Sequence, residues 1–171
     1  MQVDNCQLGQ APAAYFRAAR GDHDAQAAMA SLMIEQGLAG DVPLDAAITM
    51  ALIWSHMATT SGKACHLLAY AGLLLAQASR APVEVYESGA FDDYFATALA
   101  ITDAVADAGH GRAEIIAFAL ASRVSPAVIA KAVELKRQFE VAPLSDEDRQ
   151  GDIAAMQGVV DALGADAMGS C

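Results

Sequence analysis

Turn-forming residues divide the chain into eight segments of helix length, and this division constrains the fold more than any other feature of the sequence. Glycine and proline are the residues that most often end or interrupt helices. The helices predicted between these breaks cover residues 12–20, 24–36, 46–60, 63–79, 90–108, 112–122, 126–139 and 145–163. Loops are predicted at 37–45 and 80–89, and no segment is predicted as a strand. The sequence therefore predicts an all-α fold.

Two of these helices carry recognisable start or stop signals. Asp22 or Asp24 is expected to cap the second helix with its side chain, and Gly37 is expected to stop it. Ser125 precedes Pro126, and a hydroxyl cap followed by proline at the first helical position is a clear start signal. We therefore expect helices to begin at these two sites.

The composition agrees with closely packed helices. Of the 171 residues, 40 are alanine and only 6% are aromatic. Alanine favours helix formation, and its small side chain is typical of thin elements packed close together. The length suits one compact domain, which at this size buries roughly 70% of the surface of its unfolded chain.

The net charge of −11 narrows the classes of partner. Binding to nucleic acid and docking on an anionic membrane both rest on clustered lysine and arginine, so we expect neither. Residues 87–171 carry −8 of this charge, which indicates a solubilising field. The uncharged stretches at 46–62 and 64–79 contain polar residues and fall short of the roughly 18–20 apolar residues of a membrane span.

The three cysteines, Cys6, Cys65 and Cys171, are odd in number and show no CxxC spacing. They predict free thiols in a reducing compartment, with neither a disulfide framework nor a zinc site. The first residues lack a basic stretch followed by an apolar run, so no signal peptide is predicted. We therefore expect a cytoplasmic location.

An internal repeat is the most informative pattern. Gly21, Gly62 and Gly109 each lie between two predicted helices, at spacings of 41 and 47 residues. The positions 8, 9 and 12 residues after them are Met29, Ala30 and Met33, then Tyr70, Ala71 and Leu74, then Ala117, Phe118 and Ala121. The first two copies share a large–small–large pattern that the third loosens. Small residues at fixed positions allow two helices to cross closely, as stacked αα-hairpins require.

A second pattern precedes two of these glycines. The residues 11, 8 and 4 positions before Gly62 are Ala51, Trp54 and Ala58, and those before Gly109 are Ala98, Ile101 and Val105. The string A-x-x-W-x-x-x-A-x-x-x-G, together with Asp24-Ala25-Gln26, Met29-Ala30 and Val42-Pro43-x-Asp45, resembles the Sel-one-like repeat family, a relative of the tetratricopeptide repeats. The resemblance spans residues 13–140.

The resemblance implies a short right-handed αα-hairpin solenoid. It would contain two to three hairpins at 1–140, with a C-terminal capping helix and tail at 141–171 in the same structural unit. The residues that define the repeat would be Gly21, Ala25, Met29, Ala30, Ala51, Trp54, Ala58, Gly62, Ala98 and Gly109.

Members of that family act mostly as adaptors that hold another protein or a peptide, and the resemblance implies the same function here. Helices 24–36, 63–79 and 111–123 would line the concave face. The partner-binding residues carried over to that face are Asp24, Ser31, Glu35, Leu68, Leu75, Arg112 and Arg123. The predicted helix 145–163, or a second copy of the chain in a homodimer, would cover the remaining apolar surface.

The candidate catalytic groups do not assemble into a known constellation. No metal-ligand spacing relates the four histidines, which are His23, His56, His66 and His110. Cys65 and His66 are adjacent in a helix and point about 100° apart, and Asp92-Asp93 fits helix capping better than acid–base chemistry. We predict a non-enzymatic protein with no cofactor and no metal. The alternative is a small helical enzyme or ligand-binding domain with an interior pocket near His66 and Tyr70.

Overall fold

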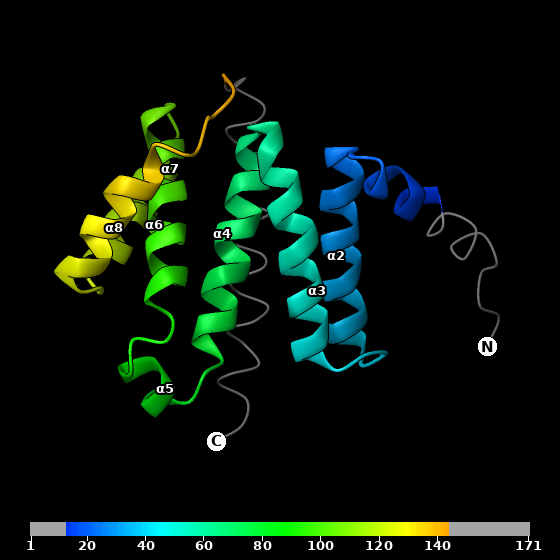
Figure 1. Cartoon of the computed structure of the whole chain (residues 1–171), viewed down its shortest axis with the longest axis horizontal. Helices are drawn as coiled ribbons and strands as arrows, with labels where there is room; N and C mark the ends of the chain where they lie inside the picture. The colour runs from blue at the N-terminus through cyan, green and yellow to red at the C-terminus, as the bar shows by residue number, and fades with distance from the viewer. Residues whose placement is uncertain (1–12, 144–171) are drawn as a thin grey trace. The chain divides into compact units, whose positions relative to one another are not determined.

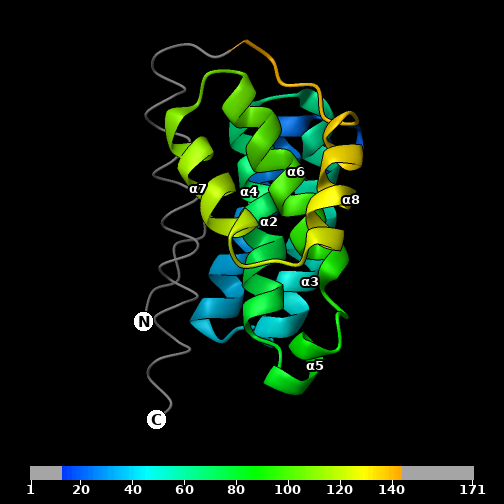
Figure 2. The same ribbon diagram turned by 90° about the vertical axis from the view of Figure 1, so that its left-hand side faces the viewer.

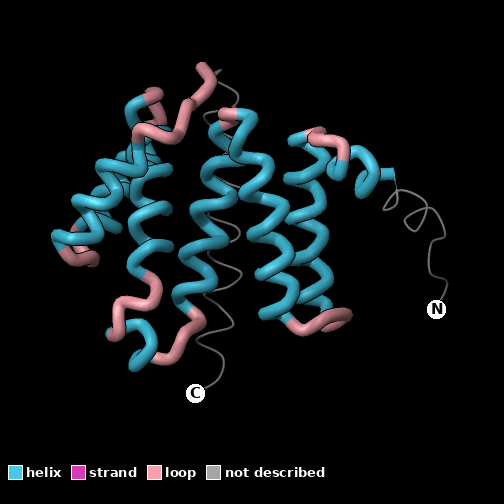
Figure 3. Tube along the Cα trace, viewed as in Figure 1, coloured by secondary structure: helices cyan, strands magenta, loops and turns pink. Residues whose placement is uncertain are grey.

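The computed structural model describes residues 13–143, apart from the side chains of Val83, Tyr86 and Arg112. Every regular element in this range is a helix (Figures 1 and 3), so the all-α prediction is confirmed. The chain divides into two compact units, Met1–Ser61 (unit 1) and Gly62–Cys171 (unit 2). The predicted helix 145–163 and the cysteines Cys6 and Cys171 lie outside the described residues. The predicted division after residue 140 stays a prediction.

Unit 1 is a helical hairpin preceded by a short helix at residues 13–19. Its hairpin consists of α2 (His23–Ala39) and α3 (Leu44–Ala58), which pack against each other (Figure 1), and η1 (Thr59–Ser61) follows α3. Within residues 13–143 no helix is long and apolar enough to cross a membrane.

Asp22 caps the N-terminus of α2. Its carboxylate accepts a hydrogen bond from the backbone N of Ala25 at 3.0 Å and forms an ion pair with Arg17 at 2.5 Å. These contacts, the bond from Ala25 first, hold the pKa of Asp22 below its ordinary value of 3.8. Of the two predicted caps, Asp22 is therefore the one used, and Asp24 lies exposed in the first turn.

The predicted helix stop at Gly37 is wrong. α2 runs on to Ala39 and ends at Gly40, which has a φ of +80°. Gly37 instead lies buried where α2 crosses α3, and a Cβ added there would lie 2.6 Å from Cβ of Ala47 and 2.9 Å from Cδ1 of Leu44. Ordinary carbon contacts are about 3.5–4.0 Å, so Gly37 permits an approach that any side chain would block.

Gln26 ties the short helix at 13–19 to α2. Its side chain is 2% exposed, and its Nε2 donates a hydrogen bond to the carbonyl of Ala18 at 3.0 Å. The rings of Tyr15 and Trp54 meet edge to face with centroids 5.9 Å apart, which joins the short helix to α3 as well. The hairpin therefore holds the short helix by a buried hydrogen bond and an aromatic contact, together with the Arg17–Asp22 ion pair and the packing of Ala18 on Ala25 and Met29.

Unit 2 contains α4 (Ala64–Ser79), α5 (Val83–Glu87), α6 (Asp92–Asp107), α7 (Gly111–Ala121) and α8 (Pro126–Lys136). α6 packs against α4, α7 and α8, and Figure 2 shows α7 and α8 flanking it. The start predicted at Ser125 is confirmed, because its side chain accepts a hydrogen bond from the backbone N of Val128 at 3.3 Å. The ends of α4, α6 and α7 lie within two residues of the prediction, whereas α5 lies inside the predicted loop 80–89 and α8 ends three residues before Phe139.

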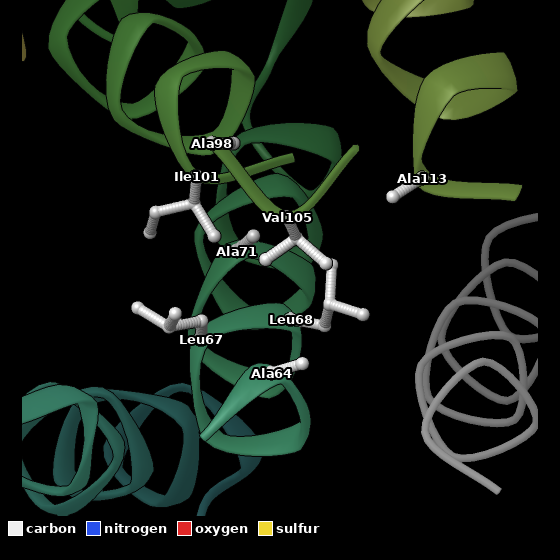
Figure 4. Packing of buried hydrophobic residues seen from close by; sticks show 8 residues of the cluster. All are labelled: Ala64, Leu67, Leu68, Ala71, Ala98, Ile101, Val105 and Ala113. Atoms are coloured by element: carbon white, nitrogen blue, oxygen red, sulfur yellow. The ribbon is translucent and has the colours of Figure 1, made fainter. Parts of the chain in front are cut away.

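Apolar contacts between α4 and α6 form the main core of unit 2 (Figure 4). Leu67 and Leu68 of α4 lie against Ile101 and Val105 of α6, and none of the four is more than 1% exposed. Ala113 of α7 belongs to the same cluster. A second cluster joins α6 to α7 and α8 through Ala96, Leu99, Ala100, Ala117, Val128 and Ala132.

Two lysines of α8 form ion pairs with aspartates of α6. Lys131 Nζ lies 2.5 Å from Asp93, and Lys136 Nζ lies 2.6 Å from Asp103 and 2.7 Å from Asp107. Burial lowers the pKa of Lys136, but its hydrogen bonds to the two carboxylates outweigh burial and raise the pKa above 10.5. These ion pairs connect α8 to α6 outside the apolar contact between the two helices.

The three repeat glycines adopt the same unusual backbone conformation. Gly21, Gly62 and Gly109 have φ values of +89°, +69° and +103°, a region that glycine enters without steric cost. Gly62 is further constrained, since its carbonyl accepts a hydrogen bond from the backbone N of Ala142 at 2.8 Å. The chain beyond α8 therefore returns to the beginning of α4.

Candidate functional site

Three residues predicted to bind a partner lie on α2 in unit 1. Asp24, Ser31 and Glu35 are exposed and share one face of the helix, because their spacings of seven and four residues match the helical repeat. The hydroxyl of Ser31 donates to the carbonyl of Ala27 at 3.3 Å, within its own helix. This part of the predicted surface is accessible to a partner.

Leu68 and Leu75, the two leucines predicted for the partner-binding face, lie in or against the core of unit 2. Leu68 is 1% exposed inside the α4–α6 core, and Leu75 packs, half-buried, against that core. α4 uses this side to pack against α6, so the expectation that Leu68 projects toward a partner is wrong, and Leu75 offers only part of its surface.

The two predicted arginines belong to α7 and the turn after it. Arg112 lies in the first turn of α7, and its side chain lies outside the described part of the chain. Arg123 is exposed just beyond the C-terminal end of α7. Arg123 is therefore the predicted residue of unit 2 that the structure places on the surface.

α7 carries an exposed apolar surface that the sequence analysis did not identify. Ile115 is 67% exposed and Phe118 is 77% exposed, and their spacing places the two one turn apart on the side of α7 opposite its buried residues. α7 packs on α6 through Ala113 and Ala117, which are 0% and 7% exposed. We call Ile115 and Phe118 the α7 apolar face.

The repeat pattern contained a signal for this face. The position nine residues after the repeat glycine is Ala30 in the first copy and Ala71 in the second, and both are buried. In the third copy this position is Phe118, and the preceding residue, Ala117, is the buried one. In the third copy the small residue is at position eight and the large residue is at position nine, so Phe118 is exposed.

The residues weighed for catalysis take part in structural contacts. His66 and His110 are 6% and 1% exposed, and among residues 13–143 no group of histidine, cysteine, aspartate or glutamate side chains is arranged to hold a metal ion. Burial, with the nearby phenol of Tyr94, raises the pKa of Tyr70 above 10.0. The phenol of Tyr70 is therefore protonated at neutral pH and cannot act as a base there.

No model of a protein family matches the chain, and no curated protein and no solved structure matches it either. The described part of the chain establishes the class of an all-α protein.

Proposed function

We propose that this protein is a non-enzymatic adaptor that binds an amphipathic helix of a partner protein on the α7 apolar face. The observation that carries the proposal is the exposure of Ile115 and Phe118 on adjacent turns of one helix. Contiguous apolar surface on a soluble protein marks interaction sites far more often than isolated exposed residues do. A helix binds such a surface through side chains spaced three or four residues apart.

The packing supports the proposed solenoid of two to three right-handed αα-hairpins, related to the Sel-one-like repeats. α2 packs against α3 and α4 packs against α6, as expected of the first two hairpins, whereas α7 and α8 each pack against α6 and flank it (Figure 2). The shared positive φ of Gly21, Gly62 and Gly109 supports a common turn in each copy. In such a solenoid α7 belongs to the concave side.

The α7 apolar face has charged neighbours of both signs, Glu114 in the first turn of α7 and Arg123 beyond its end. Arg123 is exposed at the end of α7, one turn beyond Ala119 and close along the chain to Phe118. A partner helix with apolar residues against Phe118 and a carboxylate near Arg123 would match both features. The setting we propose is the cytoplasm, in keeping with three cysteines that lack disulfide spacing.

The test compares Phe118→Glu with Val133→Glu in the full-length chain. Val133, on α8, is 55% exposed and lies outside the α7 apolar face, so it controls for the added charge. Partners are captured from a cell extract by crosslinking, purified, and titrated calorimetrically against each variant. We expect the Kd to rise at least tenfold with Phe118→Glu and less than twofold with Val133→Glu, because buried aromatic anchors dominate such interfaces. Equal affinity of a purified partner for all three proteins would contradict the proposal.

A further inference from the structure

The α7 apolar face lies close to the point where the described chain ends. Ala142 is bonded to Gly62 at the beginning of α4, and Val141 packs against the cluster that contains Ala113, near the beginning of α7. The 28 residues that follow, 144–171, therefore start at the end of unit 2 where α4 and α7 also begin. A segment of this chain starts beside the surface that needs covering.

The sequence of this segment predicts an amphipathic helix. Apolar residues recur at spacings of three, four and three residues, at Ile153, Met156, Val160 and Leu163. The helix predicted at 145–163 would be about 28 Å long, and α7 from its first residue to Arg123 spans about 18 Å. The segment is therefore long enough to cover the whole of α7.

The spacing of residues along the segment matches the spacing along α7. Three residues of the segment lie 38 positions after three exposed residues of α7 and its C-terminal turn: Ile153 after Ile115, Met156 after Phe118, and Asp161 after Arg123. In a parallel alignment the two apolar pairs and the ion pair form together. In the same alignment residue 145 lies level with position 107, about 6 Å before the first residue of α7. This is the end of unit 2 at which Pro143, the last described residue, is found.

Charge contributes one favourable contact to this pairing. Residues 144–171 contain six acidic residues and one arginine, and the exposed cation at the end of α7 is Arg123. The parallel alignment brings Asp161 to Arg123, and it also sets Asp152 opposite Glu114, so the starting point and length of the segment select it over a second copy.

We infer that residues 145–163 form a helix that binds the α7 apolar face of the same molecule, parallel to α7. The segment then occupies the surface that the proposed function assigns to a partner, and a partner must displace it. The inference shares the α7 apolar face with the proposed function but requires no partner to exist. The segment also shields Phe118 from water in the isolated protein.

Hydrogen exchange on the full-length chain tests the pairing. In the wild-type protein we expect amides of residues 150–163 to be protected from exchange, and Phe118→Glu to reduce this protection at least tenfold. Met156→Asp changes the other side of the contact and is expected to give the same loss. Val133→Glu should leave the protection within twofold of the wild type. An unprotected segment in the wild type, or equal protection in Phe118→Glu and Val133→Glu, would overturn the inference.

A photo-crosslinker at position 118 separates the segment from a second copy. Benzoylphenylalanine replaces Phe118 in an equal mixture of ¹⁵N-labelled and unlabelled protein, and the crosslinked peptides are sequenced. We expect links to residues 150–163 in which both peptides carry the same label. Mixed-label links would assign the α7 apolar face to a second copy and overturn the inference. Loss of partner affinity in Phe118→Glu without loss of protection would retain the proposed function and reject this inference, and the converse result would do the opposite.

Discussion

Replacing Gly37 by alanine tests the close crossing of α2 and α3. In an exposed helix this change would add about 1 kcal/mol to the free energy of unfolding, through helix propensity. Here the new Cβ would lie 2.6 Å from Cβ of Ala47, roughly 1 Å inside a normal contact. Cβ of Ala47 is attached directly to the α3 backbone, so the two helices themselves must separate. Overpacking of this kind costs about 1–3 kcal/mol, and we place it at the upper end, which leaves a net loss of about 2 kcal/mol.

Urea denaturation followed by circular dichroism measures the effect. Gly111→Ala is the matched control, because Gly111 is also helical and an added Cβ there meets nothing within 4 Å; we expect it to be neutral or stabilising. The double variant Gly37→Ala with Ala47→Gly restores the space. Its loss of unfolding free energy should therefore be about 1–2 kcal/mol smaller than the sum of the losses in the two single variants. A Gly37→Ala protein as stable as the wild type, or an additive double variant, would refute the argument.

Three further outcomes follow from the contacts. Gly62→Ala should cost more stability than Gly21→Ala, because both glycines have positive φ but only Gly62 would place a Cβ 2.9 Å from the backbone oxygen of Glu140; equal midpoints in urea would contradict this. Lys136→Met should cost about 0.5–1 kcal/mol at neutral pH and low salt, and the difference should disappear as the pH rises through the elevated pKa, above 10.5, where the wild-type lysine loses its charge. Asp22→Asn keeps a capping oxygen but loses the charge, so its stability deficit should be present above pH 3.8 and vanish as the pH falls through the lowered pKa; a deficit that persists at pH 2 would be evidence against the assignment.

The helices and their turns could be predicted because their signals are local. The cap at Ser125 and the glycine turns at Gly21, Gly62 and Gly109 each depend on a few neighbouring residues, and the structure places all of them as expected. The helix α5 could not be predicted in the same way, because five residues are too few to show a helical repeat. Local pattern thus predicts the helices of seven or more residues in the described chain, including the one at 13–19, and misses the five-residue α5.

The burial of individual side chains could not be predicted from the same signals. Gly37 has the sequence appearance of a helix stop, yet its role depends on Ala47 of another helix. Leu68 was assigned to a partner-binding face, yet the side of α4 that packs on α6 decides its burial. Both errors concern which face of a correctly predicted helix meets its neighbour, and that choice depends on tertiary contacts.

The abundance of alanine and the exposure of Phe118 have a common physical cause. Alanine supplies most of the buried apolar residues of the described chain, and each one removes little area from water. Such interfaces are stable only when the helix axes approach closely, so a helix that packs through alanine turns its small residues toward its neighbour. α7 follows this rule by burying Ala113 and Ala117 against α6, which leaves Ile115 and Phe118 on the opposite side. The close packing of α7 on α6 therefore also leaves the α7 apolar face exposed.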